Sequence, residues 1–183
     1  MIIREYSKTM KDGKTYRFRS VEAHDASMMY ELRLKTAAET DFLLRYPEEY
    51  PGTCDKEAEA VTAAMNSDRD LLLGAFDGED LVGSAHVFPV SAYRKFAHRC
   101  EIGVLLSRDY WSCGIGKTLM TDSMEIARTM GYTIMQLETF VQNERALGMY
   151  EHLGFHKVGI IPGGAILKDG TRYDEIMMYK ELE

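Results

Sequence analysis

One stretch of the sequence, residues 101–119, limits the fold more than any other. Its apolar beginning reads as a strand, a polar turn follows, and Gly114-Ile115-Gly116 opens a helix. The first N–H groups of a helix lack partners inside the helix and carry a partial positive charge, and glycine lets an anion approach the backbone closely. The segment therefore predicts a strand–turn–helix unit able to hold a phosphate, although an ordinary strand-to-helix turn would use the same glycines.

Two common phosphate-binding motifs do not fit this turn. A P-loop requires G-x-x-x-x-G-K-[ST]; Gly116-Lys117-Thr118 supplies its end, but Trp111 stands where the first glycine should be. The dinucleotide-binding fingerprint requires a third glycine at the position that Leu119 occupies. The sequence thus argues against a P-loop NTPase and against a Rossmann-type dinucleotide site.

Composition and charge exclude further classes. The chain has 183 residues, 45% of them apolar and 28% charged, and no linker or repeat divides it, so we expect one domain over residues 1–183. Its 22 basic and 29 acidic residues give a net charge of −7, which argues against a nucleic-acid partner. No apolar stretch approaches the ~18 residues of a membrane span, and the polar N-terminus shows no signal peptide. We expect a cytoplasmic protein with no membrane partner.

The cysteines do not indicate crosslinks or a metal. Cys54, Cys100 and Cys113 are odd in number, lie far apart and form no CxxC pair. Such a pattern favours free thiols in a reducing compartment over a disulfide framework or a zinc site. We therefore predict no bound metal.

The apolar periodicity predicts a chain of mixed strands and helices. The expected strands cover residues 14–21, 70–76, 81–89, 98–106, 132–141, 155–161 and 173–179. The expected helices cover residues 24–38, 55–65, 114–130 and 143–153, with Gly131 and Gly154 as stop signals.

A second motif follows the glycine turn after one helix and one strand. Residues 143–155 fit the pattern N-x-x-A-x-x-x-Y-x-x-x-G-F at every named position: Asn143, Ala146, Tyr150, Gly154 and Phe155. Together with the turn, this segment resembles the GCN5-related N-acetyltransferase (GNAT) family, whose members carry [QR]-x-x-G-x-[GA] at the turn. The chain departs from that pattern once, with Trp111 in place of Gln or Arg. The resemblance covers residues 101–155 in motifs, and in element order it runs from about Arg17 to the end of the chain.

The resemblance implies an α/β (α+β) fold, in which a mixed, mostly antiparallel sheet of six to seven strands is flanked by about four helices. It also implies acetyl-CoA as cofactor and direct transfer of its acetyl group to a primary amine. The pantetheine would meet the backbones of Val104 and Leu106, and the N–H of Val104 or Leu105 would polarise the thioester carbonyl. The pyrophosphate would be held by backbone N–H groups of Trp111, Ser112, Cys113, Gly114, Ile115 and Gly116.

The resemblance also suggests the catalytic residues. Tyr150 is the candidate general acid for the leaving thiolate, although a core-packed helix tyrosine would fit the same position. Glu101 is the candidate base that deprotonates the amine, directly or through water, and the alternative is a solvated glutamate at a strand end. Glu138 is the reserve candidate. Asn143 is expected to cap its helix and, as in similar proteins, to contact the cofactor.

Three residues near the turn have two interpretations each. Cys113 fits a small turn residue better than a nucleophile, because no histidine lies nearby in sequence. Lys117 and Arg108 fit a phosphate contact and a solvated side chain equally well.

The family places the acceptor site in the segments that correspond to residues 34–53 and 162–173. The first segment contains carboxylates and aromatic rings that suit a cationic amine, although loop carboxylates are often simply solvated. These residues are Glu39, Thr40, Asp41, Tyr46, Glu48, Glu49 and Tyr50.

Three functions remain open from the sequence. The first is acetylation of a small-molecule amine, the second is acetylation of a protein lysine or N-terminus, and the third is a non-catalytic acyl-CoA-binding module. Tyr150 and Glu101 favour an enzyme over the third. The sequence also leaves open whether the protein forms a homodimer.

Overall fold

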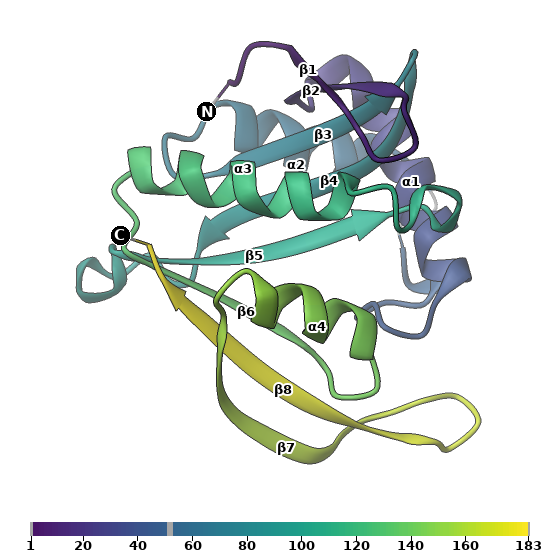
Figure 1. The fold of residues 1–183 in the computed structure, drawn as a ribbon, viewed down its shortest axis with the longest axis vertical. Coiled ribbons are helices and arrows are strands. Elements are labelled where there is room, and N and C mark those ends of the chain that lie inside the picture. The colour runs from purple at the N-terminus through teal and green to yellow at the C-terminus, as the bar shows by residue number, and fades with distance from the viewer. Residues whose placement is uncertain (1, 51–52, 183) are drawn as a thin grey trace.

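The computed structural model describes residues 2–50 and 53–182 and contains one eight-stranded sheet with helices on both faces. The strands lie in the order β1-β2-β3-β4-β5-β6-β8-β7 (Figure 1). Their bounds are Tyr6–Thr9 (β1), Thr15–Ser20 (β2), Leu71–Asp77 (β3), Asp80–Pro89 (β4), Arg99–Leu106 (β5), Ile134–Phe140 (β6), His156–Ile166 (β7) and Arg172–Glu181 (β8). The α-helices are Ala26–Glu39 (α1), Asp55–Met65 (α2), Ile115–Thr129 (α3) and Glu144–His152 (α4).

All neighbouring strands pair antiparallel except β5 and β6, which run parallel and are joined through α3. A parallel pair needs such a crossover, because a tight turn can join only antiparallel strands. The expected mixed, mostly antiparallel fold with about four flanking helices is confirmed.

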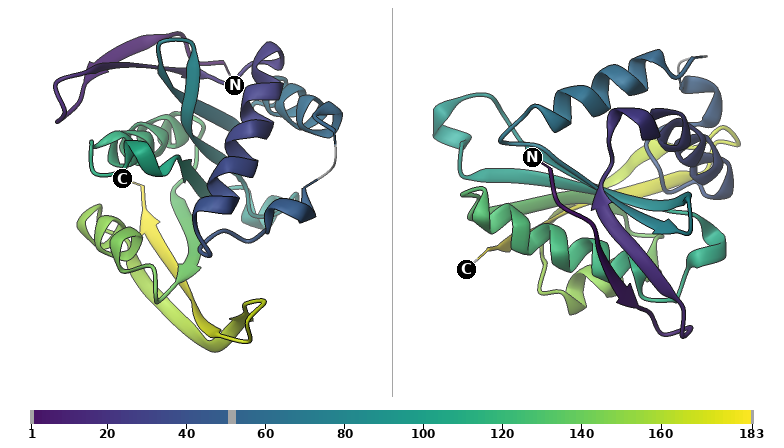
Figure 2. Two further views of the ribbon diagram at one scale, coloured as in Figure 1. Left: turned by 90° about the vertical axis from the view of Figure 1, so that its right-hand side faces the viewer. Right: turned by 90° about the horizontal axis from the view of Figure 1, so that it is seen from above.

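Two apolar cores cover the two faces of the sheet. The larger one lies under α3 and α4 and contains Leu119 and Met120, both fully buried. The smaller one lies under α1 and α2 and contains Met29 and Val61. Figure 2 shows the two helix pairs on opposite sides of the strands. The central strand β3 is buried on both faces, which explains its nearly continuous apolar sequence.

The structure adds one strand to the expected set and lengthens another. β1 was not predicted, because its sequence Tyr6-Ser7-Lys8-Thr9 is mostly exposed at the sheet edge and lacks apolar alternation. β7 continues through Pro162 to Ile166, five residues beyond the expected end. An edge strand tolerates proline because its outward N–H has no ladder partner to lose.

The three cysteines are free thiols, one exposed, one buried and one partly buried. In the part of the chain that the structure describes, no helix combines the length and apolarity needed to cross a bilayer.

Candidate active site

The centre of the sheet opens between β5 and β6. These strands pair only over three positions, which join residues 99–101 to residues 134–136. Beyond Glu101, β5 continues to Leu106 with no further pairing to β6 among the described residues. The second half of β5 therefore presents one backbone edge that is not paired with β6, and this divergence of the two strands is called the opening below.

The register with β4 shows which amides of β5 face this opening. At the two ends of the pair, the Ser107 N–H donates to the Val82 carbonyl (3.0 Å) and the Val90 N–H donates to the Arg99 carbonyl (3.4 Å). Hydrogen-bonding direction alternates along an antiparallel strand, so odd-numbered residues of β5 bond to β4. The N–H groups of Val104 and Leu106 consequently face β6, whereas that of Leu105 faces β4.

The turn between β5 and α3 carries a run of unpaired backbone donors. Ser112 has a φ of 65° and Gly114 one of 104°, and α3 begins at the next residue. The first helical hydrogen bond runs from the Thr118 N–H to the Gly114 carbonyl (3.0 Å). Within residues 2–50 and 53–182, no acceptor is recorded for the N–H groups of residues 112–117. The turn thus presents the clustered donors that the sequence predicted.

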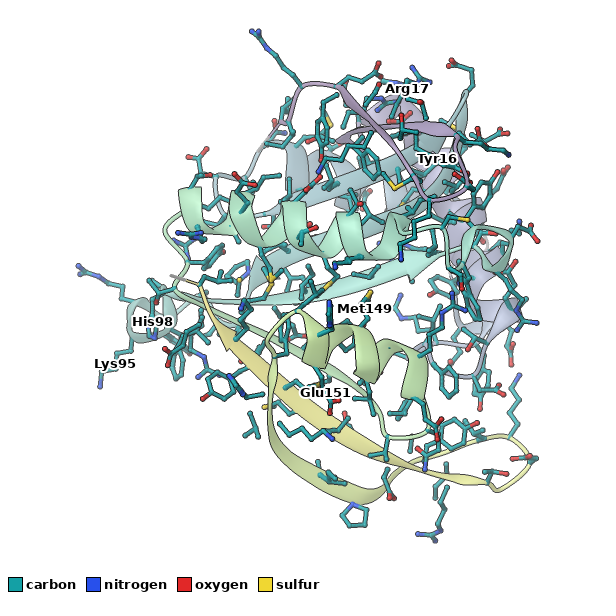
Figure 3. All side chains as sticks on the ribbon, viewed as in Figure 1. Tyr16, Arg17, Lys95, His98, Met149 and Glu151 are labelled. Atoms are coloured by element: carbon teal, nitrogen blue, oxygen red, sulfur yellow. The ribbon has the colours of Figure 1, made fainter. Side chains whose placement is uncertain are left out.

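Gly116 leaves space beside these donors. A Cβ at this position would lie 3.6 Å from Leu106 Cδ2 and 3.9 Å from Met149 Sδ, which are ordinary contact distances. Met149 projects from α4 toward this region (Figure 3). Protein packing therefore does not require a glycine here, whereas close approach of a ligand to the backbone would.

The Trp111 ring packs at the turn, between a backbone carbonyl of β5 and two arginine side chains. Its N–H already donates to the Arg108 carbonyl (3.1 Å), and its indole Nε1 donates to the Leu106 carbonyl (2.8 Å). The Arg108 and Arg145 guanidinium carbons lie 5.5 and 4.6 Å from the ring centroid, and Arg145 also donates to Ser112 Oγ (2.9 Å). Two cations are held at the donor-rich turn, and the free amides begin at Ser112 instead of Trp111.

The β1–β2 connection packs against the same turn. The Lys11 N–H donates to the Cys113 carbonyl (3.1 Å), and Met10 Sδ lies 3.7 Å from Thr118 Oγ1. Burial and the nearby Asp12 carboxylate raise the pKa of the Cys113 thiol. A raised pKa keeps this thiol protonated, which does not suit a nucleophile.

The helix α4 carries Asn143 and Tyr150. Asn143 Oδ1 accepts from the Ala146 N–H (3.3 Å), so the predicted N-cap is confirmed, and its Nδ2 lies 3.5 Å from Thr139 Oγ1. Tyr150 packs partly buried against the core under α3, with its ring centroid 6.0 Å from that of Phe155. Burial raises the pKa of Tyr150 to about 12. No described residue is recorded as a hydrogen-bond partner of its hydroxyl.

Glu101 lies on the opposite face of the sheet. Side chains alternate along a strand, and Leu105, which shares the parity of Glu101, packs against the α1–α2 core. Burial, and then repulsion from Glu138, raises the pKa of Glu101, while Gln136 Nε2 lies 3.5 Å from its Oε2. The two candidate catalytic side chains thus lie on either side of the opening between β5 and β6.

Two further carboxylates share this face. Burial and the neighbouring Glu175 raise the pKa of Glu138. Glu175 was not a candidate from the sequence. It precedes Ile176, which packs in the core under α3, and side chains alternate along a strand, so Glu175 lies on the opposite face. The face that Glu101 occupies is therefore acidic.

The predicted acceptor segments lie against each other. The rings of Phe42 and Tyr173 have centroids 5.8 Å apart, the Lys168 N–H donates to the Tyr46 hydroxyl (3.0 Å), and Lys168 Nζ pairs with Glu48. The loop after α1 and the β7–β8 hairpin therefore form one wall on the face of Glu101.

Several loop carboxylates are already engaged within the protein. Glu39 accepts from the Arg108 N–H (2.8 Å), and Glu49 accepts from the Tyr46 N–H (2.8 Å). Glu48 is paired with Lys168. These three groups stabilise the loop and its junction with α1.

The sequence of the chain is similar to those of known acetyltransferases. The model of the Acetyltransferase (GNAT) family matches residues 32–155. A Bacillus subtilis (strain 168) protein, YwnH, named as a candidate phosphinothricin acetyltransferase, is 31% identical over 91 residues, which are 50% of this chain and 53% of that protein. The match thus spans about half the length of that relative.

Solved structures share nearly the whole fold. An acetyltransferase of the GNAT family from Streptococcus pneumoniae superposes with a TM-score of 0.86 at 23% identity, over 91% of this chain and 99% of that one. A GNAT superfamily phosphinothricin acetyltransferase from Sinorhizobium meliloti, solved in complex with AcCoA, gives a TM-score of 0.81 at 17% identity, over 96% of this chain and 89% of that one. The family match, the two motifs and the opened sheet agree, and this chain belongs to the Acetyltransferase (GNAT) family.

Proposed function

We propose that the protein is an acetyl-CoA-dependent N-acetyltransferase that transfers an acetyl group directly to a primary amine of a small molecule. The observation that carries this proposal is the opening between β5 and β6. On one face of this opening lie Tyr150 and the backbone N–H groups that can bind a phosphate, and on the other face lies Glu101. A donor and an acceptor can meet there from opposite sides without a covalent enzyme intermediate.

The residues present fit the cofactor. The unpaired N–H groups of residues 112–116 suit the pyrophosphate, and Arg108, Arg145 and Lys117 add positive charge around them. The N–H groups of Val104 and Leu106, which face the opening, suit the pantetheine amides. Asn143 lies at the start of α4 beside this space, where a cofactor contact is compatible with its capping role.

Acetyl-CoA supplies the activated acyl group when it is bound. The Val104 N–H would donate to the acyl oxygen as negative charge develops there, and one preorganised donor of this kind contributes about 3 kcal/mol. Of the two amides expected from the sequence, Val104 is the one whose direction supports this role, because that of Leu105 faces β4.

Tyr150 would hold the proton that the departing sulfur needs. A pKa of about 12 keeps its hydroxyl protonated at neutral pH. A free thiol has a pKa of about 8.5, so full proton transfer from tyrosine to thiolate is uphill even at contact, and the hydroxyl would stabilise the departing sulfur by donating a hydrogen bond to it. Tyr150 therefore contributes a positioned donor more than a strong acid.

Glu101 would accept the proton of the incoming ammonium group, directly or through one water. A lysine-like amine has a pKa of about 10.4, so nearly all of it is protonated at neutral pH. The raised pKa of Glu101 makes this carboxylate a better base than an exposed glutamate. Glu138 is the reserve base on the same face.

The wall between the loop after α1 and the β7–β8 hairpin favours a small acceptor. The contacts of Lys168 with Tyr46 and Glu48 close one side of the acceptor face. A polypeptide acceptor needs an extended open groove. This arrangement suits a compact amine better.

A thiol-release assay tests the proposal. We expect acetyl-CoA to give free thiol when members of a panel of small amines are added, and the Tyr150→Phe variant to be slower at unchanged acetyl-CoA affinity. Turnover only with lysine-containing peptides would assign a protein acetyltransferase instead. Acetyl-CoA binding without turnover on either panel would assign a non-catalytic module.

A further inference from the structure

A cavity of about 360 Å³ lies on the face of Glu101, at the end of the sheet where β5, β6 and β8 meet the β4–β5 connection. Lys95 and His98 project from this connection at the end of the molecule (Figure 3). A volume of this order suits a small molecule. The lining includes Lys95, Phe96, His98, Arg99, Met177 and Tyr179.

The charge of this cavity is opposite to that of the protein. Lys95 and Arg99 are cationic, and no carboxylate is among the described residues that line it. The chain as a whole carries −7, and Glu101 and Glu138 lie farther along the same face. An acidic stretch and a basic cavity are therefore adjacent.

Arg99 has hydrogen-bonding capacity that the protein does not use. Its Nε is buried and makes no hydrogen bond with any described residue. Its Nη2 donates to Gln136 Oε1 (2.5 Å), and its guanidinium carbon lies 5.8 Å from the Phe96 ring centroid. No carboxylate among the described residues is recorded as a partner of Arg99, so an anion that enters the cavity can pair with the guanidinium group that lines it.

Gln136 connects this cation to the candidate base. Its Oε1 accepts from Arg99, and its Nε2 lies 3.5 Å from Glu101 Oε2. Arg99 and Glu101 are two residues apart on one strand and share a face, so their Cα atoms are about 6.6 Å apart. A short molecule can reach both side chains.

We infer that the acceptor is an amine that also carries an acid group, as an amino acid does, with its anion bound by Arg99 in the cavity and its amine beside Glu101. The apolar side chains of Phe96, Met177 and Tyr179 suit an apolar or aromatic remainder. This inference rests on the proposed function, because it assigns the acceptor of the same site.

The first experiment compares matched acceptors. Phenylalanine and phenethylamine differ only in the carboxylate, and kcat/KM for each is measured by thiol release. We expect wild type to favour phenylalanine at least 10-fold, Arg99→Met to lose this preference, and Arg99→Lys to retain part of it. Arg128→Met, on the exposed far end of α3, is the matched control and should behave as wild type. Equal rates for both acceptors in wild type would overturn the inference and leave the proposed function standing.

The second experiment needs no turnover. Phenylpropionate, which has the anion but no amine, is titrated into wild type and Arg99→Met by calorimetry, with the acetyl-CoA-induced rise in Tm confirming that the variant is folded. Binding at least 10-fold weaker in the variant supports the inference even if no acceptor is acetylated. Equal binding, or no binding to wild type, overturns it.

Discussion

The Gly116→Glu variant separates cofactor binding from folding. A Cβ at this position would lie 3.6 Å from Leu106 Cδ2 and 3.9 Å from Met149 Sδ, so the first turn of α3 accommodates a Cβ without a clash. Replacing a helical glycine contributes about 0.5–1 kcal/mol, and an acidic group in the first turn adds about 0.3–1 kcal/mol. We expect the free energy of unfolding to be unchanged or to rise.

The same substitution should weaken the binding of acetyl-CoA. A carboxylate about 4 Å from a phosphate charge costs roughly 4 kcal/mol at an effective dielectric constant of about 20. Because about 1.36 kcal/mol corresponds to a factor of ten, affinity should fall on the order of 10³-fold. Gly114 is unsuitable for this test, since its φ of 104° would make any side chain strain the backbone.

Thermal unfolding measures both effects. At about 100 times the Kd, acetyl-CoA should stabilise wild type by about 2.7 kcal/mol, which raises Tm by roughly 5–10 °C for a chain of this size. The variant should show at least the wild-type Tm without ligand and no rise with it. Gly159→Glu, on the exposed edge strand with no atom within 4 Å of an added Cβ, is the matched control and should keep the rise. A folded Gly116→Glu protein that binds acetyl-CoA within tenfold of wild type would refute the phosphate site.

Three further predictions concern catalysis and stability. Tyr150→Phe should lower kcat about 10²-fold, measured by thiol release at saturating substrates. An unchanged kcat would show that Tyr150 is not the proton donor. A base must be ionised, so kcat/KM should rise with pH through the raised pKa of Glu101. Glu101→Gln should abolish that limb, with its largest loss above the pKa of Glu101, where wild type carries the ionised base. Glu138→Gln should move the limb to lower pH by removing repulsion, and a pH profile that both variants leave unaltered excludes the pair. Asn143→Ala should cost about 1 kcal/mol through the lost hydrogen bond to the Ala146 N–H, seen as a Tm lower by about 2–4 °C, and an equal Tm would mean that the cap contributes nothing.

The second half of the chain was the more predictable from sequence. Local signals determine it: Asn143 as a cap, Gly131 and Gly154 with positive φ after helices, and the glycine turn before α3. The N-terminal strand β1 was missed because an exposed edge strand is held by backbone pairing and leaves little apolar pattern.

The chemistry of the acceptor face depended on long-range pairing. Arg99 meets Gln136, and Glu138 meets Glu175, only because β5, β6 and β8 are neighbours in the sheet, and no local pattern encodes that order. The alternation of apolar and polar residues along each strand predicts which face of the sheet a side chain occupies. It did not tell which other side chain would lie beside it.

The hairpin formed by β1 and β2 lies outside the segment that the family model matches, yet its connection touches the turn before α3 through Lys11 and Met10. A substitution in this hairpin can therefore shift the proposed phosphate-binding turn without any change in the segment that the family model matches. Removal of the first fourteen residues would take away the contacts of Lys11 and Met10 with the turn before α3, so an affinity tag is better placed at the C-terminus.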